Sequence, residues 1–317
     1  RFLFDGLTHI TEITRTSATL NWKSSKGFHQ YHVIELRGKD RVIRDSLNKD
    51  KSSIQLNNLI PDSTYTFMVR AIDNSGFLDT NTKTMTLKTL PWPNFTNQKA
   101  ISLNGSQAIE LPASNTLELG KDFTISLWVK LNGSMQKDAR IFTFHRESFA
   151  TTNLALAINA NKLKLIYSNK LNEIKSLKKS VDIFDNQWHQ IAIVKKNTKL
   201  TVFVDAKKIL TLAQELPSFG THPAFLGSYS GIQKGLKAKL DEFAIFKKAF
   251  SYQQILELNN NNLSMDLTEH SMQKHLKTWY QLGDQNQDTT VVITDVISAK
   301  NATPLNLKPR DFIRDSP

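Results

Sequence analysis

Apolar and polar residues alternate along most of the chain in short runs that are separated by turn-forming residues. In the first part of the sequence such runs fall at 18–22, 31–36, 53–56, 65–71 and 84–87. Alternation with a period of two places every second side chain on the same face of a β-strand. Short strands at this spacing, with no helical repeat among them, predict an antiparallel β-sandwich.

Two aromatic residues make this prediction more specific. Trp22 ends an early strand, where its indole would fill the space between two sheets. Tyr65 follows Leu59 by six residues, and Pro61 forces a turn between them. This is the tyrosine-corner pattern, in which the phenol hydrogen-bonds to upstream backbone. These features resemble the fibronectin type III family over residues 1–91. The resemblance implies a spacer or binding module without catalytic activity, in which Trp22 and Tyr65 are structural.

Pro91 and Pro93 mark the end of this module, because proline stiffens a connection and cannot donate to a β-ladder. Beyond them the alternation returns in longer runs. These runs fall at 122–130, 153–158, 162–167, 188–195 and 199–205. The last two are separated by a short turn and predict a hairpin.

Several stretches of this second region carry another resemblance. They are 103–106, 123–129, 188–192, 202–205 and 240–246, the last followed by Phe250 and Ser251. In order and spacing they resemble the laminin G-like members of the concanavalin A-like jelly rolls. The resemblance implies a β-sandwich that binds glycans or proteins through loops at one rim, sometimes with calcium. It also implies that Trp128 and Trp188 are structural residues.

The C-terminal segment resembles a part that this jelly roll lacks. Residues 276–284, which include Trp279, are similar to the opening strand of a laminin G-like domain, and too few residues follow for a further domain. We therefore expect the segment to complete the second sandwich, with Trp279 in its core. The predicted fold class is all-β: a fibronectin type III sandwich at 1–91, a jelly roll at 92–262, and a C-terminal extension at 263–317 that packs on the jelly roll.

The sequence predicts a protein without enzymatic activity. It contains no cysteine, which excludes thiolate metal sites and cysteine nucleophiles. It lacks the carboxylate motif of the glucanases with this fold, and it has no nucleophile elbow. His189 stands at a strand start and is expected to be packed or hydrogen-bonded. No cofactor is expected. Calcium at Asp241, which precedes Glu242, is the weaker alternative, because Ca²⁺ needs six or more oxygens and no acidic loop supplies them.

The charge of the chain is unevenly placed. Its formal value is +12, and residues 93–262 hold 22 Lys and Arg against 13 Asp and Glu. Such a surface attracts anionic glycans, envelopes or nucleic acid, although a lysine-rich, merely soluble strand surface is an equally simple reading. No nucleic-acid-binding motif supports that last partner. No apolar run approaches the roughly 20 residues that a transmembrane helix needs.

These features favour an extracytoplasmic adhesion or recognition protein that resembles bacterial surface or phage virion and tail-fibre proteins. Its expected partner is a glycan or an anionic envelope surface, bound by the jelly roll, and its expected location is the cell surface, the virion surface or the periplasm. The chain begins at Arg1 without a leader, which predicts a fragment or a mature form. Candidate ligand-binding residues lie in predicted loops: Asn159, Asn161, His145, Arg146 and Tyr229.

Two other functions stay open at this point. One is a purely structural module that assembles a fibre as a homo-oligomer, a trimer if the protein is fibre-like. The other is a carbohydrate-active enzyme, which would need two carboxylates about 5–9 Å apart in a groove. An exposed rim pocket with amide and aromatic side chains would favour recognition over both.

Overall fold

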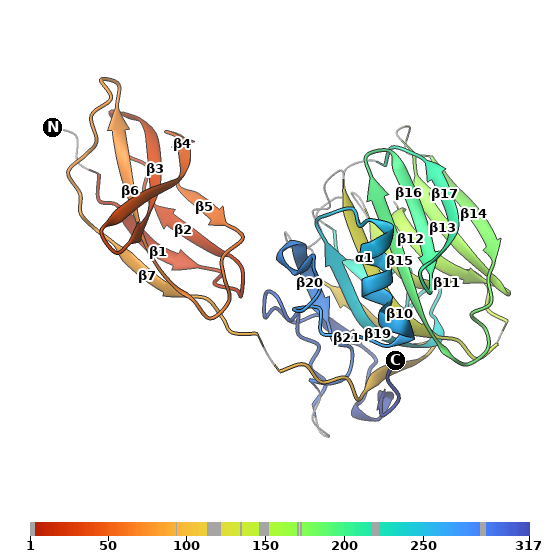
Figure 1. Ribbon diagram of the computed structural model, residues 1–317. Helices are drawn as coiled ribbons and strands as arrows, with labels where there is room; N and C mark the ends of the chain where they lie inside the picture. Colours follow the sequence, from red (N-terminus) through yellow and green to blue (C-terminus); the bar gives the residue numbers. More distant parts are fainter. Residues whose placement is uncertain are drawn as a thin grey trace. The chain divides into compact units, whose positions relative to one another are not determined.

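The protein is described by a computed structural model in which the chain forms two compact units, Arg1–Pro93 and Asn94–Pro317 (Figure 1). The residues that the structure describes are 4–92, 94–112, 122–133, 135–145, 152–169, 171, 173–216, 222–285 and 290–317. Each unit has an apolar core of its own. None of the helices in this described part has the length and apolar character that a membrane crossing requires.

The first unit is a sandwich of two antiparallel sheets. One sheet contains β1 (Leu7–Thr11), β2 (Ala18–Trp22) and β5 (Ser53–Leu56), and the other contains β3 (Phe28–Arg37), β4 (Asp40–Asn48), β6 (Thr64–Asp73) and β7 (Met85–Lys88). Trp22 and Tyr31 lie between the sheets, with ring centroids 5.6 Å apart. The Tyr65 hydroxyl accepts a hydrogen bond from Ile60 N at 2.7 Å, which is the tyrosine corner that the sequence predicts.

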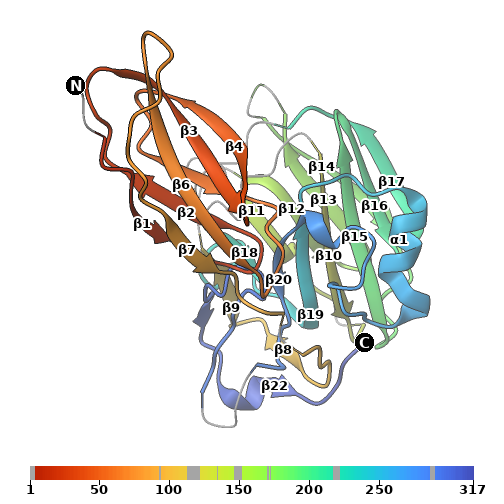
Figure 2. The ribbon, with the colours of Figure 1, turned by 60° about the vertical axis from the view of Figure 1, so that its left-hand side comes forward.

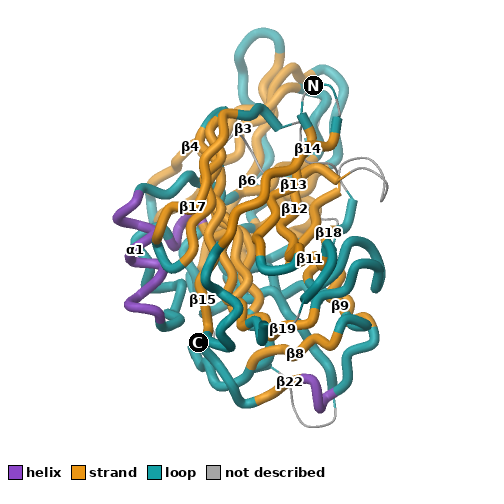
Figure 3. Tube along the Cα trace, turned by 90° about the vertical axis from the view of Figure 1, so that its right-hand side faces the viewer, coloured by secondary structure: helices purple, strands orange, loops and turns teal. Residues whose placement is uncertain are grey.

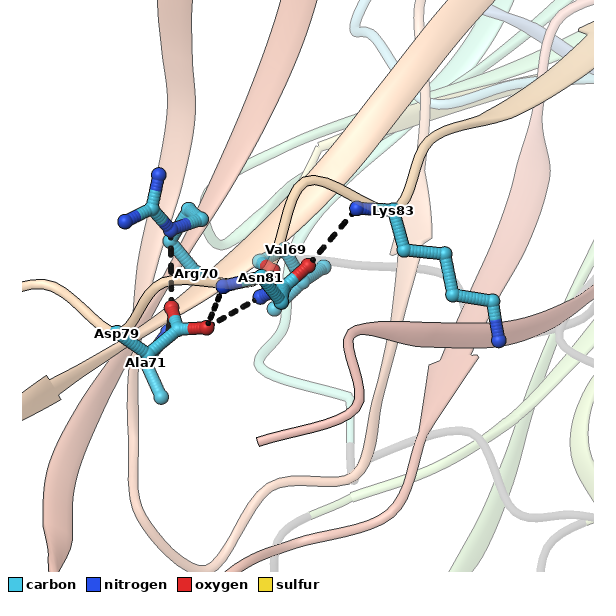
Figure 4. A network of polar contacts seen from close by, with 6 residues as sticks. All are labelled: Val69, Arg70, Ala71, Asp79, Asn81 and Lys83. Carbon is cyan, nitrogen blue, oxygen red and sulfur yellow. Dashed lines mark hydrogen bonds and ion pairs between the residues drawn. The ribbon is translucent and has the colours of Figure 1, made fainter. Parts of the chain in front are cut away.

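Two polar side chains replace strand pairing between β6 and the segment that leads to β7 (Figure 4). Asp79 Oδ1 accepts hydrogen bonds from Ala71 N and Arg70 Nε, each at 2.9 Å. Asn81 N donates to Asp79 Oδ2 at 2.8 Å, and Asn81 Nδ2 donates to Val69 O at 3.1 Å. The buried carboxylate and its neighbouring carboxamide thus give backbone groups of β6 the partners that a regular ladder would have supplied.

The second unit is a larger sandwich, and its two layers are seen edge-on in Figures 2 and 3. Within the described residues, the eight-stranded sheet contains, in order, β17 (Lys207–Ala213), β16 (Lys199–Val204), β15 (Trp188–Lys196), β10 (Phe123–Lys130), β19 (Lys237–Phe246), β8 (Ala100–Asn104) and β22 (Phe312–Ile313), with β20 (Leu276–Tyr280) also on β19. The seven-stranded sheet contains β14 (Ile174–Ser180), β13 (Lys162–Ser168), β12 (Thr152–Asn159), β11 (Ala139–His145), β18 (Ala224–Leu226), β9 (Ala108–Leu111) and β21 (Thr303–Leu305).

The C-terminal segment contributes strands to both of these sheets. β20 pairs with the second half of β19, β21 pairs with β9, and β22 pairs with β8. Trp279, on β20, is 1% exposed and donates its indole N–H to the carboxyl group of Glu242. The prediction that this segment completes the second sandwich is therefore confirmed, and Trp279 belongs to the buried interior.

A single carboxylate fixes the end of the chain against the eight-stranded sheet. Asp315 Oδ1 accepts a hydrogen bond from the indole nitrogen of Trp188 at 2.9 Å. Lys130 and Lys239 form ion pairs with the same carboxylate. These partners lower the pKa of Asp315 to about 2, against the desolvation that would raise it. Trp188 is thus a structural residue whose indole nitrogen helps to hold the C-terminus.

The outer face of the eight-stranded sheet is covered by α1 (Tyr252–Asn259) and by the chain that follows it, including the short 3₁₀ helices η1 (Asn260–Asn262) and η2 (Gln273–His275) (Figure 3). A third such helix, η3 (Pro309–Asp311), precedes β22. Ser251 caps α1 in a capping box with Gln254. Ile255 and Leu258 are the apolar residues that the helix buries.

Two adjacent carboxyl groups are buried beneath this cover. Asp241 and Glu242 occupy a bulge in β19, where Glu242 takes a left-handed backbone conformation with φ 49°. Burial, reinforced for Asp241 by the charge of its neighbour, raises the pKa of both groups well above the usual range. Burial thus disfavours the charged form of both groups, and the Glu242 carboxyl accepts the indole N–H of Trp279.

Replacing Asp315 with Asn should weaken the attachment of the C-terminus. The pKa of Asp315 in the folded state lies below its unfolded value, so its stabilisation is present above pH 4 and is lost as the pH falls toward 2. The carboxylate is partly screened by water, so we expect a loss of about 1 kcal/mol at pH 7. Calorimetric unfolding at pH 7 and pH 2.5 measures this, with the exposed Asp182→Asn as control. Equal transition temperatures for the two variants at pH 7 would contradict the assignment.

Replacing Glu242 with Gln should flatten the pH dependence of the second unit. Because the pKa of Glu242 is raised in the folded state, its contribution is largest below about pH 4 and is lost as the pH rises through the folded value. We expect the parent to lose more stability than Glu242→Gln between pH 5 and pH 9. Thermal melts across that range test this, with the exposed Glu269→Gln as the matched control. A parent and variant with parallel profiles would show that Glu242 is already ionised.

Candidate functional site

Several connecting segments of the second unit meet at one rim of the sandwich. The strands β11, β13, β9 and β19 begin there, and β12, β8 and β21 end there, because neighbouring strands run antiparallel. We call this the rim surface. It consists of residues 104–107, 135–138, 159–162, 227–237 and 306–311.

Direct contacts join these segments to one another. The backbone O of Gln136 accepts a hydrogen bond from Ala160 N at 2.7 Å, and its side chain bonds both backbone groups of Lys237 at 2.7 and 2.9 Å. Gly105 and Gly235 touch through their backbones, since a Cβ placed on Gly235 would lie 2.0 Å from the Gly105 carbonyl oxygen. The rim surface is therefore one continuous structure and not a set of independent loops.

A pocket of about 360 Å³ opens on the rim surface between the β8–β9 turn and the segment that precedes η3. Its lining combines amide, hydroxyl, cationic and apolar side chains: Asn104, Ser106, Gln107, Asn306, Leu307, Lys308 and Arg310. Polar groups that converge on a concave surface are typical of a ligand-binding site. Four of these seven residues belong to the C-terminal segment, so the pocket requires the completed sandwich.

The pocket wall is held by hydrogen bonds of its own side chains. Asn104 Oδ1 accepts hydrogen bonds from Ser106 N and Oγ, at 3.0 and 2.6 Å, while Gln107 Oε1 accepts one from Asn104 N at 2.8 Å. Asn306 has φ 57° and donates its Nδ2 to Ser106 O at 3.0 Å, which ties the two walls together. These bonds leave Asn104 Nδ2, Gln107 Nε2 and Asn306 Oδ1 without a partner among the described residues.

Beside the pocket, a basic cluster holds the 227–235 loop against the outer face of β11. Asp138 forms ion pairs with Arg140, Lys164 and Lys234 at 3.2, 2.8 and 2.9 Å. The lysine hydrogen bonds and these nearby charges outweigh desolvation and lower the pKa of Asp138 to about 2. Arg140 and Lys234 also lie 5.4 and 5.2 Å from the ring centroid of Tyr229. These ion pairs hold the loop in place. The cluster has three cations for one carboxylate, so its net charge is positive.

The five candidate ligand residues are distributed over different environments. Asn159 and the exposed Asn161 lie on the rim surface, in the turn that contacts Gln136. Tyr229 is half-buried in the basic cluster. His145 is 2% exposed at the far end of β11, and its Nε2 donates to the Tyr229 carbonyl at 2.7 Å. Arg146 lies outside the described residues.

The pocket residues themselves were not apparent from sequence. The Asn104-Gly105-Ser106 stretch contributes to the family resemblance, but it suggests a turn and gives no hint of a cavity. Lys308 and Arg310 belong to a segment whose net charge is slightly negative. An asparagine in a left-handed conformation, here Asn306, is a useful signal, because its amide can bond locally in a tight turn.

The carboxyl pair at Asp241 does not fit a calcium ion. Asp241 Oδ1 accepts a hydrogen bond from Glu242 N, and one oxygen on each side chain remains buried without a partner. Two carboxyl groups supply fewer than the six to eight oxygens that calcium takes. Across the described residues, no group of three or more His, Cys, Asp or Glu side chains is arranged to hold a metal ion.

His189 and Trp128 have structural surroundings. His189 is 8% exposed and hydrogen-bonds Asp205 through Nδ1 at 2.7 Å and Asp185 through Nε2 at 3.0 Å. These hydrogen bonds, that to Asp205 foremost, raise the pKa of His189 and keep the ring fixed between two carboxylates. Trp128 is 3% exposed on β10, opposite Asp241. Neither side chain belongs to the rim surface.

The chain was compared with known families and structures. Residues 6–86 match the fibronectin type III domain, and residues 103–256 match the concanavalin A-like lectin/glucanases superfamily. No curated protein sequence matches. Among solved structures, a proposed carbohydrate-binding protein from Bacteroides ovatus is similar at 14% identity and TM-score 0.50, over 94% of this chain and 91% of that one.

Two other structures share less of the fold. A heptameric SAP-like pentraxin from Limulus polyphemus is similar at 13% identity and TM-score 0.41, over 52% of this chain and 83% of that one. Botulinum neurotoxin type C, whose cell entry depends on interaction with two ganglioside molecules, is similar at 11% identity and TM-score 0.38, over 84% and 48%. At this level of similarity these two structures add nothing to the family matches. The two matched families follow one another along the chain in the order that the sequence predicts. The chain is a fibronectin type III domain followed by a concanavalin A-like domain that the C-terminal segment completes.

Proposed function

We propose that this protein is a glycan-binding adhesion or recognition protein that acts outside the cytoplasm, on a cell or virion surface, with the pocket of the rim surface as its binding site. The fibronectin type III domain serves as the spacer. The observation that carries the proposal is the pocket of about 360 Å³ with amide groups converging on it. Its concanavalin A-like fold, and the similarity in fold to a proposed carbohydrate-binding protein, support the same reading.

The chemistry of the pocket suits sugar hydroxyl groups. Asn104 Nδ2 and Gln107 Nε2 are donors, and Asn306 Oδ1 is an acceptor, so a ring with adjacent hydroxyls can both accept and donate. Leu307 offers an apolar patch for the C–H face of a sugar ring. Because the turn hydrogen bonds already fix Asn104 and Asn306, little side-chain entropy is lost when a ligand binds.

The proposed activity is binding without hydrolysis. Cleavage of a glycosidic bond by the usual route needs two carboxylates on opposite sides of the bond. The residues described as lining the pocket include none. Incubation with a bound oligosaccharide, followed by mass spectrometry of the sugar, should return it intact, and the appearance of shorter fragments would show an enzyme instead.

Replacing Asn104 with Asp should weaken glycan binding. The substitution keeps the Oδ1 acceptor that shapes the turn and removes the Nδ2 donor of this pocket-lining residue. We expect at least a tenfold loss of affinity, about 1.4 kcal/mol, for glycans identified by an array screen of the parent. Asn74→Asp makes the same chemical change at an exposed position of the first domain and should bind like the parent. Unchanged affinity in Asn104→Asp would place the glycan elsewhere.

A further inference from the structure

The rim surface carries cations that pair with no carboxylate of the described residues. Lys308 and Arg310 line the pocket, and Lys137, Lys162 and Lys237 lie on the neighbouring segments. All five are exposed, and none forms an ion pair in the part of the chain that the structure describes. Each remains available to a ligand.

The carboxylates on these segments are already engaged. Asp138 is surrounded by Arg140, Lys164 and Lys234, three cations for one negative charge. Asp311 Oδ2 accepts a hydrogen bond from Lys308 N at 2.8 Å and closes the turn that begins η3. The rim surface therefore has a positive potential at the mouth of its pocket and along the route toward β12 and β13.

The positions of these cations follow the contacts that join the rim. Lys237 lies against Gly105 in the pocket wall, with its side-chain carbons 3.4 Å from a Cβ placed there. Its backbone is bonded to Gln136, which in turn contacts the turn ahead of Lys162. A chain that leaves the pocket across this contact meets further positive charge.

We propose that the glycan recognised here is anionic. Lys308 and Arg310 bind a carboxylate or sulfate group in the pocket. The anionic groups of the following sugar residues interact with Lys237, Lys162 and Lys137. This inference rests on the proposed glycan-binding function and specifies its ligand class. Arg310 can hold a carboxylate or sulfate through two parallel N–H groups, while Lys308 contributes a point charge. The amides beside them bind the sugar ring itself, which distinguishes the ligand from a polyanion that offers charge alone.

Nucleic acid is the less favoured ligand of the same charge. Binding of single strands relies on exposed aromatic side chains on which bases stack. The residues that line the pocket include none, and the ring of Tyr229 is already covered by Arg140 and Lys234.

The test is calorimetric titration of the full chain with pairs of oligosaccharides that differ in charge alone. Suitable pairs are an oligogalacturonate with its methyl ester and a sulfated oligosaccharide with its desulfated form, measured at 50 and 300 mM NaCl. We expect the charged member to bind at least tenfold more tightly at low salt, and this preference to shrink at high salt as the charges are screened.

Lys308→Gln and Arg310→Gln should each remove most of that preference and leave the neutral member's affinity within twofold of the parent. Arg314→Gln is the matched control, because it makes the same change at an exposed residue outside the pocket. A double Lys162→Gln and Lys237→Gln variant should lose affinity for hexasaccharides and keep it for disaccharides, since a disaccharide fills the pocket alone.

The outcomes separate the two proposals. If neutral and charged members bind equally and Asn104→Asp still weakens both, the glycan site stands and the anionic specificity is wrong. If Arg310→Gln behaves like Arg314→Gln, the specificity is equally refuted. If no oligosaccharide of an array binds, both proposals fail. If single-stranded DNA binds as tightly as the sulfated sugar and competes with it, the surface binds polyanions whether or not they contain the sugar ring of the glycan. That result would overturn the inference.

Discussion

The second domain depends on the completion of one strand edge. The edge of β19 that faces away from β10 is paired in two parts, with β8 at Lys237–Leu240 and with β20 at Phe243–Phe246. β8 and β20 lie far apart in the sequence, and the bulge at Asp241 and Glu242 separates their pairing sites. Without β20, half of a central strand would expose unpaired backbone groups in a largely buried layer, which is costly. The return of the C-terminal segment is therefore a condition for the fold.

The pairing of β20 with β19 also determines the surroundings of the acidic side chains nearby. The bulge turns two carboxyl groups into the interior, where burial raises the pKa of both, and Trp279 of the returning strand supplies a hydrogen bond to one of them. Asp315, near the chain end, stays ionised because Lys130 and Lys239 lie beside it. These three carboxyl groups are thus buried in the interior or paired near the surface, whereas Lys308 and Arg310 at the rim form no ion pair within the described residues.

The sequence was sufficient to predict those elements whose signal lies within one continuous stretch of residues. Alternation, Trp22 and the tyrosine corner at Tyr65 identified the first sandwich, and the resemblance of the strand containing Trp279 to a missing opening strand identified the role of the C-terminal segment. Both signals are visible in one stretch of residues. The proposed binding pocket could not be found in this way, because its walls at Asn104 and Asn306 are about 200 residues apart and are joined by the pairing of β21 with β9 and the hydrogen bond from Asn306 to Ser106.

The overall charge of the chain indicates a basic second domain, but it does not show which of its cations lie free beside a cavity. The excess of Lys and Arg lies in residues 93–262. In the structure, Lys164 and Lys234 form ion pairs with Asp138 beside the 227–235 loop, and the lysines of β14 lie on the exposed edge strand of the seven-stranded sheet. The cations that remain available beside a cavity, Lys308 and Arg310, come from the segment with a slightly negative net charge. A net charge sums over groups that are already paired, whereas recognition depends on the groups that folding leaves unpaired next to a surface of suitable shape.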